Sequence, residues 1–182
     1  MKYLRYFISV FLLSILALQA FFFLQILAWR WVNPPITAFQ LAERHRLCGW
    51  SIPYIHSCEI KQEWIEFKKI SPYLKRAITI SEDSDFYRHA GFEPQAMKDA
   101  WDRNQKNSKH LRGGSTITQQ LAKNLFLSGE KNYVRKVQEL AITAMLEIAL
   151  PKNRIFEIYL NSVEWGEGVF GIAAASQHYF AI

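Results

Sequence analysis

Apolar residues form one long uninterrupted block near the N-terminus of this 182-residue chain. Residues 6–29, YFISVFLLSILALQAFFFLQILAW, carry no charge. As a helix the block would be roughly 36 Å long, and the hydrocarbon core of a membrane is about 30 Å thick. A cleavable signal peptide has a shorter apolar region and a small-x-small site, which LAWR at 27–30 does not supply. We therefore expect an uncleaved anchor, with Trp29 and Trp31 at the lipid–water interface.

The rest of the chain shows mainly the period of amphipathic helices. Asn33-Pro34-Pro35 ends any helix that continues from the anchor, and residues 30–70 form a connecting segment with aromatic residues to bury. Ser71-Pro72 predicts an N-cap followed by proline at the first helical position. Another helix begins at Glu93-Pro94. We find no convincing series of strands, so the expected fold class is mainly α.

Two later helices carry unusual polar faces. In the helix at 115–127, one side collects hydroxyls, amides and one cation, namely Thr116, Gln119, Gln120, Lys123 and Asn124. A second helix, at about 134–149, places Arg135, Glu139 and Thr143 opposite an apolar face of Val137, Ala141, Ala144, Met145 and Ile148. An ordinary solvated face more often mixes Glu and Lys, whereas amides suit a groove that binds sugar or phosphate. A plain amphipathic helix remains the alternative in each case.

The formal net charge of +6 favours a phosphate-bearing partner, such as nucleic acid, an anionic membrane or a pyrophosphate-linked substrate. Charge alone does not choose among them. Lys131, Arg135 and Lys136 lie near a helix N-terminus, where cations oppose the macrodipole, so a bound polyanion would explain them better than stability does. Lys123, Lys131 and Arg135 are therefore candidates for one phosphate site. The two cysteines, Cys48 and Cys58, either pair or stay free thiols, and a zinc site has little support.

Titratable residues crowd into one short segment, TISEDSDFYRHAGFEP at 79–94. They are Glu82, Asp83, Asp85, Arg88, His89 and Glu93. A solvated loop with helix-capping residues explains this pattern. A site for acid–base chemistry explains it as well, because a partly desolvated carboxylate can take a proton from a hydroxyl. The segment alone leaves both interpretations open.

Five stretches together resemble the ordered motifs of the peptidoglycan glycosyltransferases, family 51. They are EDSDFYRHAGFE at 82–93, RGGSTITQQLAKNLFL at 112–127, RKVQEL at 135–140, RIFEIYLN at 154–161 and GEGVFGIAAASQHYF at 166–180. The resemblance covers roughly residues 60–180, and five motifs in order are far more specific than any one of them. With an anchor and no transpeptidase domain, the chain is similar to the monofunctional members.

The resemblance implies a lysozyme-like helical head with a small membrane-proximal jaw, preceded by one N-terminal transmembrane helix. The expected division is a cytoplasmic N-terminus at 1–5, the anchor at 6–29, a linker and jaw-like segment at 30–70, and the head at 71–182. Family members usually continue for several more helices, so we expect the C-terminal part of the head to be missing. The expected location is the bacterial inner membrane, single-pass, with the catalytic domain in the periplasm.

The activity implied by the resemblance is polymerisation of lipid II into glycan strands, with inversion at the donor anomeric carbon and release of undecaprenyl pyrophosphate. Glu82 would be the general base and Glu139 a second essential carboxylate. Lys123, Lys131 and Arg135 would stabilise the pyrophosphate. The groove would be shaped by Arg112, Ser115, Thr116, Gln120, Asp83, Phe86 and His89. The expected partners are lipid II, the growing glycan strand, the inner membrane and cell-wall synthesis proteins, without nucleic acid.

A divalent cation such as Mg²⁺ or Mn²⁺ would also suit the leaving pyrophosphate, with ligands unknown, whereas no nucleotide cofactor is implied. The chain departs from the family pattern at Glu93, where Asp is frequent, at Lys131, where Arg is common, and at Asp85, an additional carboxylate close to Glu82. Two alternatives stay open. A lytic transglycosylase would cleave glycan strands and needs no phosphate site, and a non-catalytic membrane scaffold of cell-wall synthesis would not depend on Glu82.

Overall fold

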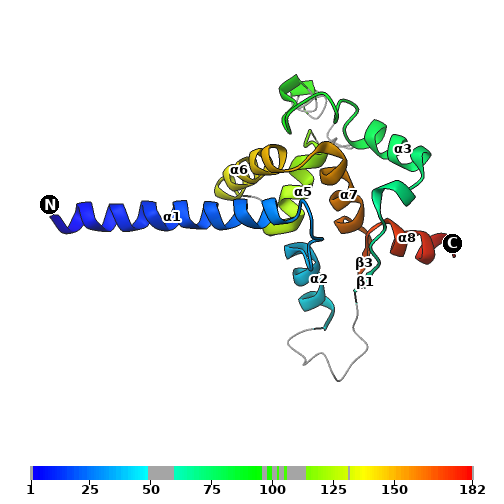
Figure 1. Cartoon of the computed structure of the whole chain (residues 1–182), viewed down its shortest axis with the longest axis horizontal. Coiled ribbons are helices and arrows are strands. Elements are labelled where there is room, and N and C mark those ends of the chain that lie inside the picture. Colours follow the sequence, from blue (N-terminus) through cyan, green and yellow to red (C-terminus); the bar gives the residue numbers. More distant parts are fainter. Residues whose placement is uncertain are drawn as a thin grey trace.

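The computed structural model describes residues 2–48, 60–95, 98–99, 102, 105, 114–130 and 132–181. The expected mainly helical fold is confirmed, and a small sheet accompanies the helices (Figure 1). The helices are α1 (Lys2–Ala28), α2 (Ala38–Cys48), the 3₁₀ turn η1 (Phe67–Lys69), α3 (Pro72–Glu82), α5 (Ile117–Phe126), α6 (Tyr133–Ala149), α7 (Lys152–Ser162) and α8 (Ile172–Phe180). The strands are β1 (Lys61–Gln62), β2 (Glu164–Gly166) and β3 (Val169–Phe170). Cys58 and the side chain of Cys48 lie outside the described residues, so both alternatives, a disulfide and two free thiols, stay open.

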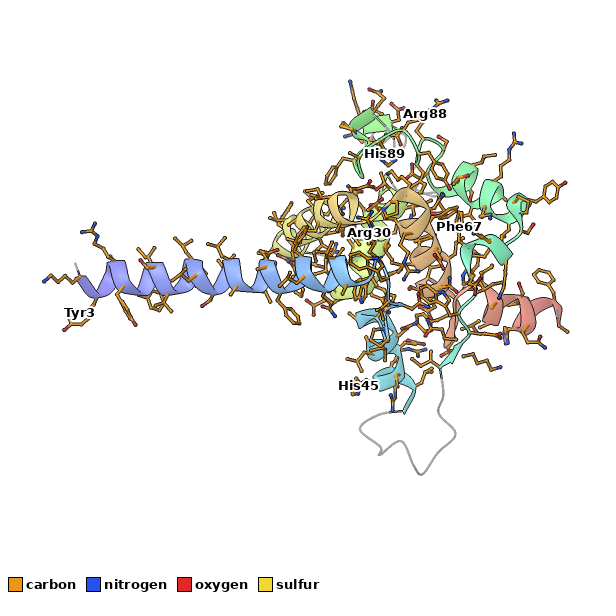
Figure 2. The ribbon with its side chains drawn as sticks, in the orientation of Figure 1. Tyr3, Arg30, His45, Phe67, Arg88 and His89 are labelled. Atoms are coloured by element: carbon orange, nitrogen blue, oxygen red, sulfur yellow. The ribbon has the colours of Figure 1, made fainter. Side chains whose placement is uncertain are left out.

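Helix α1 has two parts with different surroundings. Residues 2–18 are exposed along a straight rod that leaves the head, and their side chains stand free from Tyr3 inward (Figures 1 and 2). The helix is long and apolar enough to cross a membrane. Its C-terminal part instead packs against the head, where Ile26 is fully buried and Trp29 stacks on Phe126 at 5.1 Å between ring centroids. Trp29 is thus covered by the head whereas Trp31 is exposed, and the predicted position of both at the lipid–water interface stays a prediction.

One arginine fastens the end of α1 to the head. Arg154 on α7 donates from Nε to the carbonyl of Trp29 at 2.8 Å and from Nη2 to the carbonyl of Val32 at 2.9 Å. The same Nη2 reaches Asn33 Oδ1 at 2.8 Å. The last carbonyls of a helix lack intrahelical partners and carry partial negative charge, so a guanidinium at this position both caps and stabilises the helix end.

The segment between the anchor and α3 is joined to the main domain. Helix α2 packs against α5, and β1 pairs in parallel with β3. Asn161 on α7 accepts a hydrogen bond from the backbone N–H of Ile65 at 2.8 Å and donates one to the Ile65 carbonyl at 2.9 Å. The strand order is β1-β3-β2, and the β2–β3 hairpin contains the GEGVFG sequence. These strands of two or three residues are too short to produce a readable two-residue period, which is why we expected none.

Helix α5 lies at the centre of the head, packed against α6, α7 and α2. Burial extends around most of its circumference and includes the polar side chains of Gln119 and Asn124, so only part of its predicted polar face is exposed. Helix α6 reverses the simple amphipathic expectation: Glu139 and Thr143 are buried, while Val137 and Ile148 are exposed. Helix α3 begins as predicted, with Ser71 at the N-cap and Pro72 at the first position.

Candidate active site

Glu82 is the last residue of α3, and its side chain is exposed. Its Oε2 accepts a hydrogen bond from Nε2 of Gln120 on α5 at 2.9 Å. Oε1 of Gln120 in turn accepts a hydrogen bond from the phenol of Tyr159 on α7 at 3.1 Å. Because the phenol holds the acceptor end of the amide, the donor end faces Glu82. Glu82 is thus positioned by a neutral donor, and within the described residues it forms no ion pair.

Tyr159 is a site residue that the sequence analysis did not single out. It is 4% exposed and packs against Phe156, with 6.3 Å between ring centroids. Burial raises the pKa of the Tyr159 phenol, and the negative charges of Glu82 and Asp83 raise it further. The phenol therefore stays a donor to Gln120 at neutral pH. Its place in RIFEIYLN was visible, but its direction toward Gln120 depends on how α7 packs on α5.

Asp83 connects the residues after Glu82 to the start of α5. Its buried carboxylate accepts a hydrogen bond from the backbone N–H of Ile117 at 3.0 Å and lies 2.8 Å from Nε2 of His89. The backbone N–H of Gly91 donates to Nδ1 of His89 at 3.1 Å. Nδ1 is therefore the acceptor, so Nε2 carries the proton and donates it to Asp83. Asp83 and His89 hold the loop in place beneath Glu82.

Two further predicted residues secure the same loop. Thr116 is the N-cap of α5 within a capping box, and its hydroxyl donates to the Gly91 carbonyl at 2.7 Å. Gly91 has φ +82°, and a Cβ there would lie 2.7 Å from Thr143 Cγ2, so only glycine fits. Phe86 is fully buried, 5.4 Å from Phe156 between ring centroids. The loop is consequently built around these contacts and presents Glu82 at its start.

The second carboxylate, Glu139 on α6, has very different surroundings from Glu82. It is 3% exposed and ion-paired with two cations, Nη1 of Arg135 at 2.6 Å and Nζ of Lys136. Two positive charges against one negative charge leave a formal charge of +1 in this cluster. The buried Nε of Arg135 has no hydrogen-bond acceptor among the described residues. Lys136 was not among the predicted binding residues, although its i, i+3 spacing from Glu139 was readable.

The remaining predicted residues lie in three places. Nζ of Lys123 on α5 lies 5.2 Å from the ring centroid of Phe39 on α2. Ser115 directly precedes the N-cap of α5. Arg112 and Lys131 lie outside the described residues. Within the described part of the chain, no hydrogen bond or ion pair joins Glu82 to Glu139. The structure thus presents two separate polar groups, one at the end of α3 beside α5 and one on α6, which also packs against α5.

One group of side chains in the described ranges has the composition of a metal site. Ligand atoms of Asp83, His89 and Glu93 lie within 4.8 Å of one another. Asp83 and His89, however, are hydrogen-bonded to each other and to the backbone N–H groups of Ile117 and Gly91. Mg²⁺ requires several oxygen ligands in near-octahedral geometry. These residues therefore do not fit Mg²⁺ as they stand.

Comparison with known proteins identifies the class of enzyme. The model of the transglycosylase family matches residues 52–182, which include α3, both carboxylates and all of the predicted binding residues. The chain therefore belongs to the transglycosylase family and is a glycosyltransferase. The family that the five motifs predicted is confirmed.

Similarity to curated proteins over nearly the whole of this chain agrees with this assignment. The chain is 58% identical to a biosynthetic peptidoglycan transglycosylase of Cupriavidus metallidurans, over 99% of this chain and 76% of that protein. A protein of the same name from Cupriavidus pinatubonensis is 56% identical, over 99% of this chain and 70% of that protein. A protein of the same name from Ralstonia nicotianae is 54% identical, over 99% of this chain and 76% of that protein. In each case the similarity includes the anchor as well as the head.

Proposed function

We propose that this chain polymerises lipid II into the glycan strands of peptidoglycan. The observation that carries the proposal is the state of Glu82, an exposed carboxylate held by the neutral Gln120–Tyr159 pair. A general base needs a carboxylate that is positioned and free to accept a proton. The names of the curated relatives, biosynthetic peptidoglycan transglycosylases, support peptidoglycan as the product.

In the proposed reaction the 4-hydroxyl of the acceptor sugar attacks the anomeric carbon of the donor. Glu82 takes the hydroxyl proton as the new carbon–oxygen bond forms. The bond between the anomeric carbon and the pyrophosphate breaks, undecaprenyl pyrophosphate leaves with the electron pair, and the α configuration becomes β. Gln120 and Tyr159 keep the carboxylate at one position, which lowers the orientational cost of the step.

The proposed role of the cations is to stabilise the charge that develops on the departing pyrophosphate. Lys123 contributes from α5, and Arg135 and Lys136 contribute from α6 with a local surplus of positive charge. Glu139 orients the two α6 cations and does not take a proton in this scheme. The free Nε–H of Arg135 is a donor for a phosphate oxygen. Arg112 and Lys131 lie outside the described residues, and their place at this site stays a prediction from the sequence.

We further propose that the chain spans the bacterial inner membrane once, with the head in the periplasm. Helix α1 supports the anchor. Lys2 and Arg5 favour a cytoplasmic N-terminus, but Arg30, Arg44 and Arg46 lie on the other side and weaken this signal, so the proposed orientation rests on membership of the family. Both lipid-linked substrates lie in the same membrane, so this arrangement brings the site to the substrate. The cation surplus favours this reaction over strand cleavage, which has no phosphate to stabilise.

The proposal is tested by incubating the purified full chain with lipid II in lipid vesicles and separating the products by gel electrophoresis. We expect glycan polymer together with released undecaprenyl pyrophosphate. The same protein should not shorten preformed glycan strands. Shortened strands without polymer would overturn the proposal in favour of a lytic enzyme, and the absence of both products would favour a scaffold.

A further inference from the structure

Helix α1 contacts the head through an amide pair that the proposed reaction does not use. Nε2 of Gln19 donates to Oε1 of Gln138 at 3.0 Å, and Nε2 of Gln138 donates back to Oε1 of Gln19 at 3.2 Å. The two side chains thus satisfy each other in a closed reciprocal pair. Gln138 lies on α6 directly before Glu139, so this pair connects the membrane helix to the helix that carries the Arg135–Lys136–Glu139 cluster.

The position of Gln19 within α1 gives the pair its significance. Residues 2–18 are all exposed, and Gln19 is the first residue of the helix with a partly buried side chain. The pair therefore lies where α1 leaves the head (Figure 1). Gln19 is also surrounded by apolar sequence, where an amide without a partner is costly and an interhelical hydrogen bond is favourable.

A second attachment lies at the opposite end of the packed part of α1. Arg154 binds the carbonyls of Trp29 and Val32, about 15 Å along the helix axis from Gln19 at about 1.5 Å per residue. Two attachments this far apart on one rigid helix hold its angle to the head more firmly than either attachment does alone. Between them, Ile26 and Trp29 fill the interface with apolar contacts.

We propose that Gln19 and Gln138 are positioning residues that lock the angle between the membrane anchor and the head, and so set the orientation of the α6 cation cluster to the bilayer. The proposal rests on the proposed function, since the orientation matters for meeting a membrane-embedded substrate. A transmembrane helix tilts when its apolar length exceeds the bilayer thickness. With the angle locked, a change in tilt turns the head away from the lipid-linked pyrophosphate.

The consequence is a dependence of activity on bilayer thickness. Wild-type enzyme should show a clear optimum in phosphatidylcholine vesicles of increasing acyl-chain length that contain lipid II. In the double variant Gln19→Leu/Gln138→Leu, α1 is held less firmly where it leaves the head, so the optimum should broaden. At the wild-type optimum, kcat/KM should fall roughly threefold to tenfold, mainly through KM. The two leucines leave no unpaired amide, so the thermal midpoint should stay close to that of wild type.

The control is Ser14→Leu, since Ser14 donates only to the Val10 carbonyl of its own helix. This variant should keep the wild-type thickness optimum. The single variants Gln19→Leu and Gln138→Leu should each resemble the double variant, because either one breaks the pair. An unchanged optimum in the double variant would overturn the proposal. Equal losses of turnover and thermal midpoint, with the optimum retained, would also overturn it by showing a structural role alone. Wild-type protein that makes no polymer at any thickness would count against the proposed function instead.

Discussion

Glu82 and Glu139 are both carboxylates at motif positions, yet they differ in burial and in the groups that surround them. Glu82 is exposed at the end of α3 and receives a single hydrogen bond from a neutral amide. Glu139 is buried within the head and ion-paired with Arg135 and Lys136. Both oxygens of Glu139 are engaged by cations, whereas Glu82 meets only a neutral amide donor among the described residues and can accept a proton from a hydroxyl.

This difference indicates separate roles for Glu82 and Glu139, which the sequence motifs do not distinguish. The group around Glu82 fits proton transfer, and the group around Glu139 fits the stabilisation of negative charge. The two groups also differ in what their loss should damage. Removing Glu82 should affect turnover without affecting folding, while removing Glu139 should affect folding as well, because it leaves two cations without their partner.

The largest effect is expected for Glu82→Gln. The amide keeps the shape of the side chain but cannot accept a proton, so polymerisation of lipid II should fall by about 10²- to 10⁴-fold. The thermal midpoint should stay near that of wild type, because Glu82 is exposed. Turnover and midpoint are measured on the same purified protein. Asp85→Asn is the control, since Asp85 pairs with the exposed Arg88 at 3.0 Å, and it should retain activity. A folded Glu82→Gln variant with wild-type polymer yield would contradict the role of base.

Glu139→Gln should lower stability by about 3–5 kcal/mol, the usual cost of breaking a buried ion pair by removing one partner. Urea unfolding followed by circular dichroism in detergent measures this loss. Glu82→Gln, measured in parallel, should change stability by no more than about 0.5 kcal/mol. If Glu139→Gln instead abolished polymerisation without changing stability, Glu139 would have a direct part in the reaction and the comparison would fail.

Lys123→Ala tests the cation that lies outside the Glu139 cluster. Its loss should reduce turnover by about 100-fold, because it removes positive charge where negative charge develops on the leaving group. Lys75→Ala is the matched control, since Lys75 also places its Nζ over a phenylalanine ring, that of Phe67, at 4.2 Å. Steady-state rates for both variants should differ strongly. Similar rates would mean that Lys123 serves only its contact with Phe39.

A smaller effect is expected for Tyr159→Phe, which removes the hydrogen bond that orients Gln120. Losing one neutral hydrogen bond at the support of the base should lower kcat roughly threefold to tenfold. Tyr179→Phe is the control, because the Tyr179 hydroxyl donates to the Trp165 carbonyl and not to a residue of the Glu82 group. The losses of Tyr159→Phe and Gln120→Ala should not add, since both act through the same contact to Glu82.

The smallest effect concerns stability at alkaline pH. Burial raises the pKa of Tyr159 above its ordinary value of 10.0, so above that pH the folded chain keeps a proton that the unfolded chain has released. The contribution of this proton to the free energy of unfolding is fully present below pH 10.0. It is lost as the pH rises, by at most about 1.4 kcal/mol per pH unit. Thermal midpoints of wild type and Tyr159→Phe between neutral and alkaline pH measure it. The decline should be shallower in the variant.

The sequence predicted the fold class, the family and the beginning of α3, because these depend on long periodic segments and ordered motifs. It did not predict that α6 turns Glu139 and Thr143 inward while Val137 and Ile148 face outward. A helical wheel shows which residues share a face but not which face meets the protein. Near a membrane anchor that distinction is weakest, since lipid accepts apolar side chains as readily as a core does.

Within the candidate site, the sequence identified the residues better than the contacts between them. It placed Glu82, Gln120 and Glu139 on the list, yet it gave no sign that Tyr159 orients Gln120. That contact depends on the packing of α7 on α5, which no local pattern records. The spacing of Lys136 from Glu139 was readable, but the burial of Glu139 was not. The packing of Trp29 on Phe126 was missed for a related reason, because a tryptophan that faces lipid and one covered by a head have the same sequence signature.

The attachment of Arg154 to the end of α1 also has a consequence for the order in which the parts of the protein fold. The anchor is synthesised first and enters the membrane before Phe126, Gln138 and Arg154 have been made, because chains fold from the N-terminus as they emerge. The partners that cover Ile26 and Trp29 arrive later along the chain. The final step of folding therefore takes place against a helix already set in the bilayer, so a head without that helix would keep an open apolar groove where α1 belongs.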